Sequence, residues 1–397
     1  MSEHPSSWIE VNLGELLQFN YGKSLPNRMR SGTGFPVYGS NGVVGYHDSA
    51  LTDRETLIIG RKGSVGEVHF STRPCYPIDT TYYVDQFHSM PARYWLYLLK
   101  NLCLNELNKA TAIPGLNRED AYRTKINLAP LNEQKRIADK LDSLLARVDA
   151  CRERLDRVPL ILKRFRQAVL TAATSGQLTE DWREENFDIE PATNLVKETR
   201  FTLAASDDNL PLLPDNWEWV ALGNYAQCSR GRFSVRPRND PAYFNGKHPF
   251  IQIGNLPSEG GWITAHKQTL NEKGLAVSKK FPKGTVVIAI VGATIGNTGI
   301  LAYDMCFTDS MVGIDSGDEI SNRYIELFLR HRKEEIRQTS YAGGGQPNIK
   351  LEVLNPYPLA LPPLAEQREI VCRVEVLFAY ADRLEAHYQV ARTQVDR

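Results

Sequence analysis

The sequence lacks a charge surplus of either sign, because its 47 basic residues are matched by 47 acidic residues over 397 positions. A protein that holds nucleic acid unaided normally needs a basic excess to neutralise phosphates. Either nucleic acid is not the ligand, or a partner supplies much of that neutralisation. Charge is nevertheless uneven along the chain, and one segment is strongly basic, with Arg230, Arg232, Arg236, Arg238 and Lys247 interrupted only by Asp240.

Long hydrophobic runs and paired cysteines are also missing. The longest strongly apolar run, Val286 to Val291, is far too short to span a bilayer. The first residues show no charged-then-apolar signal pattern. The six cysteines are scattered, which argues against a disulfide framework or a zinc site and predicts a reducing, cytoplasmic location. The histidines show no metal-ligand spacing, so no metal is expected.

What the chain does contain is a long internal repeat, in the same order both times. The segment WIEVNLG at 8–14 returns as WEWVALG at 217–223, and GSVG at 63–66 returns as ATIG at 293–296. PLNEQ at 130–134 returns as PLAEQ at 363–367. The period is far longer than that of solenoid repeats, so we interpret it as a duplicated domain.

Each copy predicts a globular α+β unit followed by a helix. Short strands broken by glycine and proline fill residues 8–130, with a buried strand at Thr56–Gly60, another at Tyr82–Val84 and helical spacing from Tyr94 to Leu107. The predicted divisions are a first unit at 1–130, a first helix at 131–182, an acidic, proline-containing connector at 183–215, a second unit at 216–362 and a short second helix at 363–397.

Both helices carry a heptad pattern, which is typical of coiled coils. The first stripe is Ile137, Leu141, Leu144, Val148, Cys151, Leu155, Val158, Leu162, Phe165 and Val169. The second is Ile370, Val374, Leu377, Ala381, Leu384, Tyr388, Ala391 and Val395. We expect the helices to pair antiparallel, and Pro159 to kink or split the first one. The alternative is that each stripe packs on its own globular unit.

No catalytic motif survives inspection. The glycine-rich segments at 60–66 and 287–296 lack G-x-G-x-x-G and are interpreted as strand–turn–strand corners. Asp240–Tyr243 and Asn355–Pro358 resemble the N-P-P-Y motif of adenine methyltransferases, but both lack the double proline and a preceding glycine-rich cofactor turn. No catalytic residue is therefore predicted.

What remains is chemistry suited to base edges, for which Arg and Lys match guanine and Asn and Gln match adenine. Candidates in the first unit are Lys23, Asn27, Arg28, Arg30, Ser40, Asn41, Arg61 and Lys62. Candidates in the second are Arg230, Arg232, Arg236, Arg238, Gln252, Asn255 and Gln346. For any one of them the alternative is a solvated surface side chain.

Two variable α+β units, each followed by Pro-Leu-x-Glu-Gln and a long helix, resemble the specificity subunit of a Type I restriction–modification enzyme. The segments that carry the resemblance are LAPLNEQKRI at 128–137, LPPLAEQREI at 361–370, TAATSGQLT at 171–179, PVYGSNG at 36–42 and GRKGSVG at 60–66. The resemblance implies two tandem target recognition domains, each reading one half of an asymmetric bipartite sequence in double-stranded DNA. It also implies that the helices set the spacer and dock two modification subunits.

Catalysis would then belong to the partners. The resemblance implies no cofactor on this chain, S-adenosylmethionine on the modification subunits, and ATP and Mg on two restriction subunits, whose presence the sequence leaves open. Nothing in the second helix matches Phe165 through Trp182, so either the chain is truncated or this helix is naturally short. Two alternatives also stay open, a self-sufficient N6-adenine DNA methyltransferase and a coiled-coil scaffold that does not bind DNA.

Overall fold

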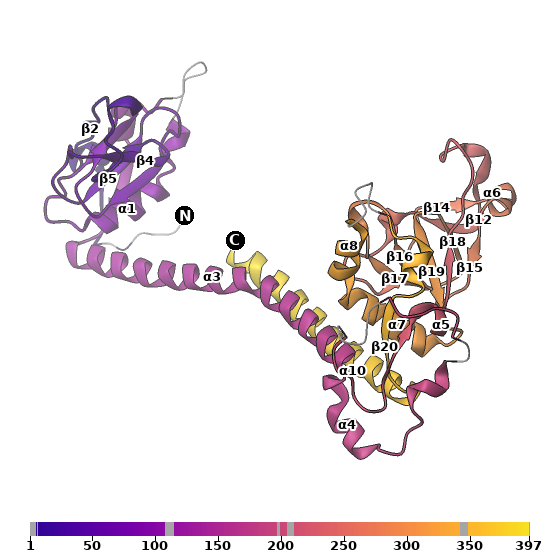
Figure 1. Cartoon of the computed structure of the whole chain (residues 1–397). Helices are drawn as coiled ribbons and strands as arrows, with labels where there is room; N and C mark the ends of the chain where they lie inside the picture. The colour runs from indigo at the N-terminus through magenta and orange to yellow at the C-terminus, as the bar shows by residue number, and fades with distance from the viewer. Residues whose placement is uncertain are drawn as a thin grey trace. The chain divides into compact units, whose positions relative to one another are not determined.

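The computed structural model describes residues 5, 7–107, 115–196, 199–204, 210–341 and 348–396. The chain divides into two compact units, Met1–Glu153 and Arg154–Arg397, and the division falls inside one long helix, α3. Each unit is described by itself (Figure 1).

The first unit is built on a four-stranded antiparallel sheet in the order β2-β8-β5-β6. Its strands are β2 (Asn20–Tyr21), β8 (Thr81–Val84), β5 (Thr56–Gly60) and β6 (Val68–Ser71). Every residue of β5 is buried, as expected of a central strand whose sequence is an unbroken apolar run. Helix α1 (Ala92–Asn101) packs on β5 and β6 and buries Trp95 and Leu99 against the sheet. The strands predicted at Thr56–Gly60 and Tyr82–Val84 are both present.

Smaller elements complete the first unit. A three-stranded sheet has the order β4-β3-β7, with β3 (Phe35–Gly39) parallel to β7 (Tyr76–Pro77) and antiparallel to β4 (Gly42–His47). Strand β1 (Ile9–Asn12) pairs with β9 (Lys125–Leu128) and so joins the start of the unit to the residues before α3. Helix α2 (Arg118–Tyr122) is capped by Asn117, whose side chain accepts hydrogen bonds from the backbone of Glu119 and Asp120.

The second unit repeats this topology with additions. Its main sheet has the order β11-β19-β16-β17-β13, its second sheet the order β14-β12-β18-β15, and β10 pairs with β20. The strands are β10 (Glu218–Ala221), β11 (Gln227–Arg230), β12 (Phe244–Ile251), β13 (Trp262–Ile263), β14 (Gln268–Leu270), β15 (Lys280–Phe281), β16 (Val286–Ala289), β17 (Thr298–Leu301), β18 (Met305–Phe307), β19 (Met311–Asp315) and β20 (Pro358–Leu361). The helices before α10 are α4 (Glu180–Glu185), α5 (Leu222–Tyr225), α6 (Glu272–Ala276), α7 (Glu319–His331), α8 (Lys333–Tyr341) and α9 (Leu351–Leu354). Helix α7 packs on β16 and β17, as α1 packs on β5 and β6.

The same joint attaches each unit to its long helix. The Trp8 indole nitrogen donates to Glu133 Oε2 at 3.1 Å, and the Trp217 indole nitrogen donates to Glu366 Oε2 at 2.8 Å. The amides of the next residues, Gln134 and Gln367, each donate to a backbone carbonyl five residues earlier, at 2.8 Å. The repeated Pro-Leu-x-Glu-Gln segment thus starts a helix and also fixes its origin against the unit before it.

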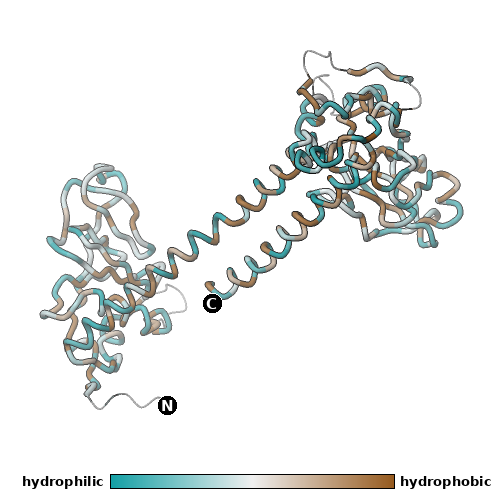
Figure 2. The backbone as a smooth tube through the Cα atoms, turned by 90° about the horizontal axis from the view of Figure 1, so that it is seen from below, coloured by the Kyte–Doolittle hydropathy of each residue, from teal (hydrophilic) through white to brown (hydrophobic). Residues whose placement is uncertain are grey.

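The long helices are α3 (Leu131–Ser175) and α10 (Leu364–Val395). Hydrophobic and hydrophilic residues alternate along both (Figure 2). Helix α3 continues through Pro159, so of the two predicted outcomes, a kink or a split, the split does not occur. Proline removes one backbone hydrogen bond and crowds the preceding turn. Helix α10 contacts α3 on both sides of the proline, through Asp156 before it and Arg166 after it.

Within the second unit α3 and α10 pack together in antiparallel orientation. Contacts run from Arg373 with Asp181, just beyond the end of α3, through Asp382 and Glu385 with Arg166, to Arg392 with Asp156. Partner numbers rise along α10 as they fall along α3, which defines the antiparallel pairing.

Burial of the seam differs along its length. Leu162, Ile370 and Val374 are buried, Phe165, Leu377 and Tyr388 are half-buried, and Leu384 is exposed. On the α3 segment that belongs to the first unit, Ile137, Leu141 and Val148 are half-buried and Leu144 is exposed, while Leu155, just inside the second unit, is half-buried. Ile370 and Val374 also belong to the hydrophobic core of the second unit. One stripe therefore serves both the helix pair and the globular unit.

Candidate nucleic-acid interface

In the first unit, two polar turns meet at one edge of the sheets. Ser40 and Asn41 form the turn between β3 and β4, and the turn after β5 begins with Arg61 and Lys62. Gly63, at φ +80°, approaches so closely that a Cβ there would lie 3.1 Å from Ser40 Oγ. This edge therefore brings together four of the predicted residues, of which Asn41 and Lys62 are exposed.

A cation–aromatic cluster adjoins this edge. The guanidinium carbon of Arg61 lies 5.2 Å from the ring centroid of Tyr21, and that of Arg118 lies 5.3 Å from the same ring. Tyr21 is half exposed, so its ring is available to a ligand. Such stacking is worth about 0.5–1 kcal/mol at exposed sites and holds the guanidinium planes in place. Burial, together with the neighbouring Tyr21, raises the pKa of Tyr82 to about 12, so its hydroxyl stays protonated and donates to Leu116 O.

Tyr21 and Arg118 were not among the residues predicted from the sequence. Residues 21, 61 and 118 are far apart in the chain, and no spacing rule connects them. The one available signal was an aromatic residue, Tyr21, followed closely by Lys23 on a segment rich in polar residues.

The four other predicted residues of the first unit have different surroundings. Asn27 is exposed, and its Oδ1 accepts from Arg30 Nη1 at 3.3 Å. Lys23 is exposed, and its backbone nitrogen bonds Pro77 O beside β7. Arg28 is exposed on a short 3-10 helix. Arg30 instead donates to Val44 O at 2.8 Å and Leu25 O at 3.3 Å. Arg30 therefore holds its own loop against β4.

In the second unit, Asp309 organises the basic segment. Its backbone oxygen accepts from Arg230 Nε at 2.6 Å, and its carboxylate accepts from Arg238 Nη2 at 2.7 Å and lies 3.9 Å from Arg236 Nη2. Arg232 turns elsewhere and donates to Ser278 O. The row of arginines is therefore positioned by hydrogen bonds, and one carboxylate neutralises part of its charge.

The remaining candidates of this unit lie near the same loops. Gln252 donates to Gln268 Oε1 at 2.7 Å, and with Arg238 it lines a cavity of about 110 Å³. Asn255 accepts from the Gln252 backbone nitrogen, which closes a short helical turn. Gln346 lies outside the described residues.

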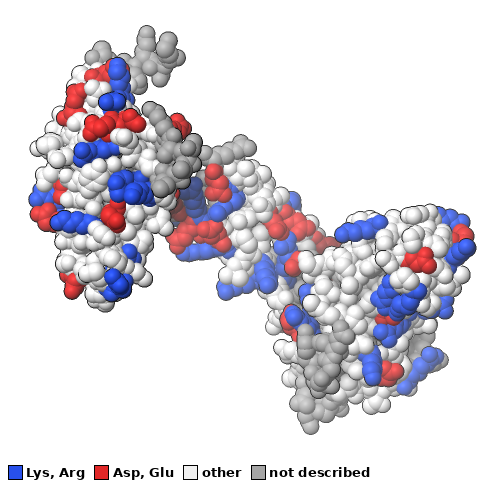
Figure 3. Space-filling model, turned by 90° about the horizontal axis from the view of Figure 1, so that it is seen from above, with Lys and Arg blue, Asp and Glu red and all other residues white. Residues whose placement is uncertain are grey.

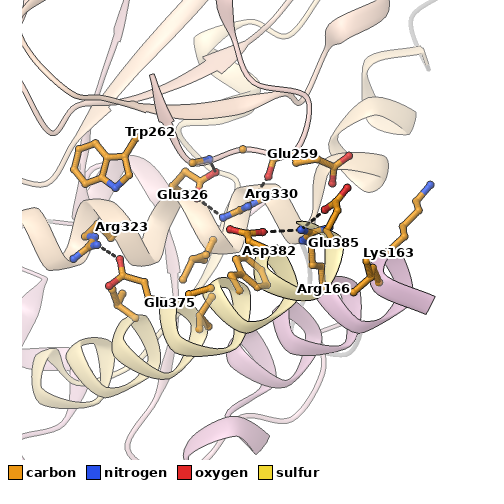
Figure 4. Close-up of a pocket in the computed structure, with 18 of the residues that line it drawn as sticks. Lys163, Arg166, Glu259, Trp262, Arg323, Glu326, Arg330, Glu375, Asp382 and Glu385 are labelled. Carbon is orange, nitrogen blue, oxygen red and sulfur yellow. Dashed lines mark hydrogen bonds and ion pairs between the residues drawn. The ribbon is translucent and has the colours of Figure 1, made fainter. Parts of the chain in front are cut away.

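A second feature of this unit is a cavity of about 570 Å³ between α7, α10 and the C-terminal part of α3 (Figure 4). Ion pairs surround it. Arg166 binds Asp382 and Glu385 at 2.7 and 2.8 Å, Arg330 binds Glu326 at 3.1 Å, and Arg323 pairs with Glu375. In the first unit Arg93 pairs with Asp142 at 3.3 Å, and these two residues correspond in the repeat to Arg323 and Glu375. These pairs fix each unit's helix on its long helix.

Figure 3 shows Lys and Arg intermingled with Asp and Glu over the face in view. Among the described residues, no three His, Cys, Asp or Glu side chains gather in a way that could hold a metal ion. None of the helices in this part of the chain is both long enough and apolar enough to cross a membrane.

Comparison with known proteins shows where this architecture recurs. The family described as Type I restriction modification DNA specificity domain matches residues 5–159 and 214–389. The specificity subunit of the Type I restriction enzyme EcoDI from Escherichia coli is 29% identical over 399 residues, covering 99% of this chain and 86% of that protein. The EcoBI specificity subunit, also from Escherichia coli, is 28% identical and covers 86% of this chain and 70% of that protein.

A solved structure shares the fold over the whole length. The crystal structure of the HsdS subunit from Thermoanaerobacter tengcongensis superimposes with a TM-score of 0.61 at 17% identity, covering 99% of this chain and 97% of that one. The family match extends over both repeats, the first part of α3 and most of α10. The chain therefore belongs to the Type I restriction modification DNA specificity domain family.

Proposed function

We propose that this chain is the DNA-recognition subunit of a Type I restriction–modification complex, with each unit reading one half of an asymmetric bipartite site. The observation that carries the proposal is the duplicated topology. The strand order β2-β8-β5-β6 of the first unit returns as β11-β19-β16-β17 in the second, which adds β13. Polar residues follow the equivalent strands β3 and β12, where Asn41 and Gln252 lie, and the sequences there differ. Two related but non-identical readers on one chain suit a site with two different halves.

The exposed turn residues supply the chemistry for reading bases. Asn41 and Lys62 in the first unit, and Gln252 and Arg238 in the second, carry the donors and acceptors that distinguish base pairs in the major groove. Tyr21, Arg61 and Arg118 lie close to the first set. Phosphate contacts would orient each unit while the turn residues select the sequence.

The long helices set the gap between the half-sites and provide the docking surface for the modification subunits. A helix is stiff, and α3 runs for 45 residues from one unit into the other. Two modification subunits would bring S-adenosylmethionine, and two restriction subunits would bring ATP and Mg. The balanced charge of this chain fits such an assembly, because partners can contribute phosphate contacts.

Recognition without catalysis is the division of labour we propose. Neither a self-sufficient methyltransferase nor a DNA-independent scaffold is favoured by the family match over both repeats. A purified chain that transferred a methyl group on its own would contradict this division.

Exchange of one unit tests the proposal. Residues 1–130 are replaced by the corresponding residues of a relative with a different target, and methylated adenines are mapped for the assembled complex. We expect one half of the recognised sequence to change to the relative's half, with the other half retained. If both halves stayed the same, the proposal would fail.

A further inference from the structure

Backbone hydrogen bonds identify which residues occupy the same place in the two units. Three bonds recur, all between 2.9 and 3.1 Å. In the first unit they run from Gly22 N to Thr81 O, from Arg61 N to Thr80 O and from Leu116 N to Arg61 O. In the second unit they run, in the same order, from Gly231 N to Met311 O, from Ile290 N to Ser310 O and from Ile349 N to Ile290 O. By these bonds Tyr21 corresponds to Arg230, and Arg61 corresponds to Ile290. Asp79 and Asp309 likewise occupy one place, directly before the residues that bond Arg61 and Ile290.

A guanidinium group lies at the same point of both units, although it comes from different positions. Arg61 Nη2 donates to Asp79 O at 2.8 Å, and Arg230 Nε donates to Asp309 O at 2.6 Å. In the first unit the cation comes from the end of β5 and the apolar partner, Tyr21, from β2. In the second unit the roles are exchanged, because Arg230 ends β11 and Ile290 follows β16.

Each guanidinium has a second cation beside it. Arg118 shares the ring of Tyr21 with Arg61, and Lys350 lines the same cavity of about 260 Å³ as Arg230 and Ile290. Within the described residues, no carboxylate lies within 4.0 Å of the Arg61 or Arg230 guanidinium in an ion pair. The nearby acidic groups are Glu119, 3.8 Å from Arg118, and Glu352, which also lines the second cavity. Asp79 and Asp309 are also close, because their carbonyls accept the two arginines, and the Asp309 carboxylate binds Arg238.

We infer that these two places are equivalent phosphate sites, one per unit, each gripping a single backbone phosphate of its half-site. The inference rests on the proposed function and names the residues that position the units: Arg61 with Arg118, and Arg230 with Lys350. A carbonyl fixes one N–H group of each arginine, and the others remain to donate to phosphate oxygens. Two units that read different bases share this cation in space, which identifies the contact as one that carries no sequence information.

Salt dependence of DNA binding separates a phosphate contact from the other roles. The assembled complex, purified through a tag on this chain, is titrated onto a duplex carrying its methylated sequence at several salt concentrations. The variants are Arg61→Gln, Arg230→Gln and the double variant. Matched controls are Arg73→Gln and Lys283→Gln, because both side chains are exposed and lie at the opposite ends of β6 and β16 from the proposed sites.

The binding constant falls as salt rises, so log K against log salt has a negative slope. Each single variant should make that slope less steep by about 1, and the double variant by about 2. Binding should weaken on the order of tenfold per site at 0.1 M salt, and the mapped methylation sequence should not change. The controls should retain the wild-type slope.

Three results would overturn the inference. An unchanged slope would remove the phosphate contact. A changed base in the methylated sequence would make the arginine a base reader. Loss of subunits from the complex, with wild-type DNA affinity in what remains assembled, would make the site a protein contact. A wild-type complex that binds all sequences equally would instead contradict the proposed function, while the slope still decides the phosphate contact.

Discussion

The buried carboxylate of Glu366 offers a comparison that the duplication makes possible within one molecule. Glu366 is fully buried and accepts hydrogen bonds from Thr179 Oγ1 at 2.6 Å, Arg183 Nη1 at 2.5 Å and the Trp217 indole at 2.8 Å. Its counterpart Glu133 accepts from the Trp8 indole at 3.1 Å and from Arg136, with 26% of its side chain exposed. The perturbation is the same substitution, to alanine, at both positions.

The expected costs differ because the surroundings differ. Glu366→Ala leaves the Arg183 charge, 17% exposed, without its partner and strands the donors of Thr179 and Trp217. Breaking a buried pair by removing one member costs about 3–5 kcal/mol. Glu133→Ala removes the acceptor of the Trp8 indole and an exposed ion pair with Arg136. The expected loss of stability is about 1 kcal/mol. The free energy of unfolding should therefore fall at least about 2 kcal/mol further in the second unit.

Hydrogen exchange at intermediate urea resolves the two units separately, so that each substitution is read in the unit that carries it. Glu366→Gln is the matched comparison, since it keeps the shape and one acceptor oxygen while it removes the charge and replaces the other oxygen by an NH2 donor; its cost should lie between those of the alanine variants. Equal destabilisation by Glu133→Ala and Glu366→Ala would refute the reasoning, because burial would then not decide the energy of this joint.

Three further outcomes are expected. Arg166→Ala should lower the melting temperature of the second unit by breaking the pairs with Asp382 and Glu385, whereas Lys163→Ala, on the same helix, should have little effect; equal effects would contradict the pairing. Burial lowers the pKa of His331 below its usual 6.5, so the unfolded chain binds the proton first and stability should fall as pH drops below about 6.5. His331→Gln should flatten that dependence in thermal melts, and an unchanged profile would exclude this histidine. Seven residues inserted after Glu153 should lengthen α3 by about 10 Å and change the gap between methylated half-sites; an altered half-site sequence would contradict the proposal that the helices set only that gap.

Local sequence determined much of the architecture in advance. The strand at Thr56–Gly60 was predictable because an unbroken apolar run between turns suits a central strand. The helix predicted from Tyr94 to Leu107 is shorter, since α1 ends at Asn101 and a 3-10 turn follows. The long helices were predictable from their heptads, and pairing of α3 with α10 confirms that expectation within the second unit.

The sites depended on contacts that sequence spacing does not encode. Nothing local indicates that Asp309 holds three arginines, or that Arg30 bonds Val44 O. In the repeats Tyr21 corresponds to Arg230 and Arg61 corresponds to Ile290, so the arginine stands at a different position in each copy. A residue-by-residue comparison of the repeats therefore does not show that the two units share a cation at one place. Such groups become visible only when the strands are paired in register.

Mapping of methylated adenines in the cell that carries this gene, with and without the gene, tests the central claim most directly. Two related readers on one chain predict a two-part sequence, with different halves separated by a fixed gap, that disappears when the gene is deleted. A continuous, undivided sequence, or a two-part sequence that persists after deletion, would contradict the account.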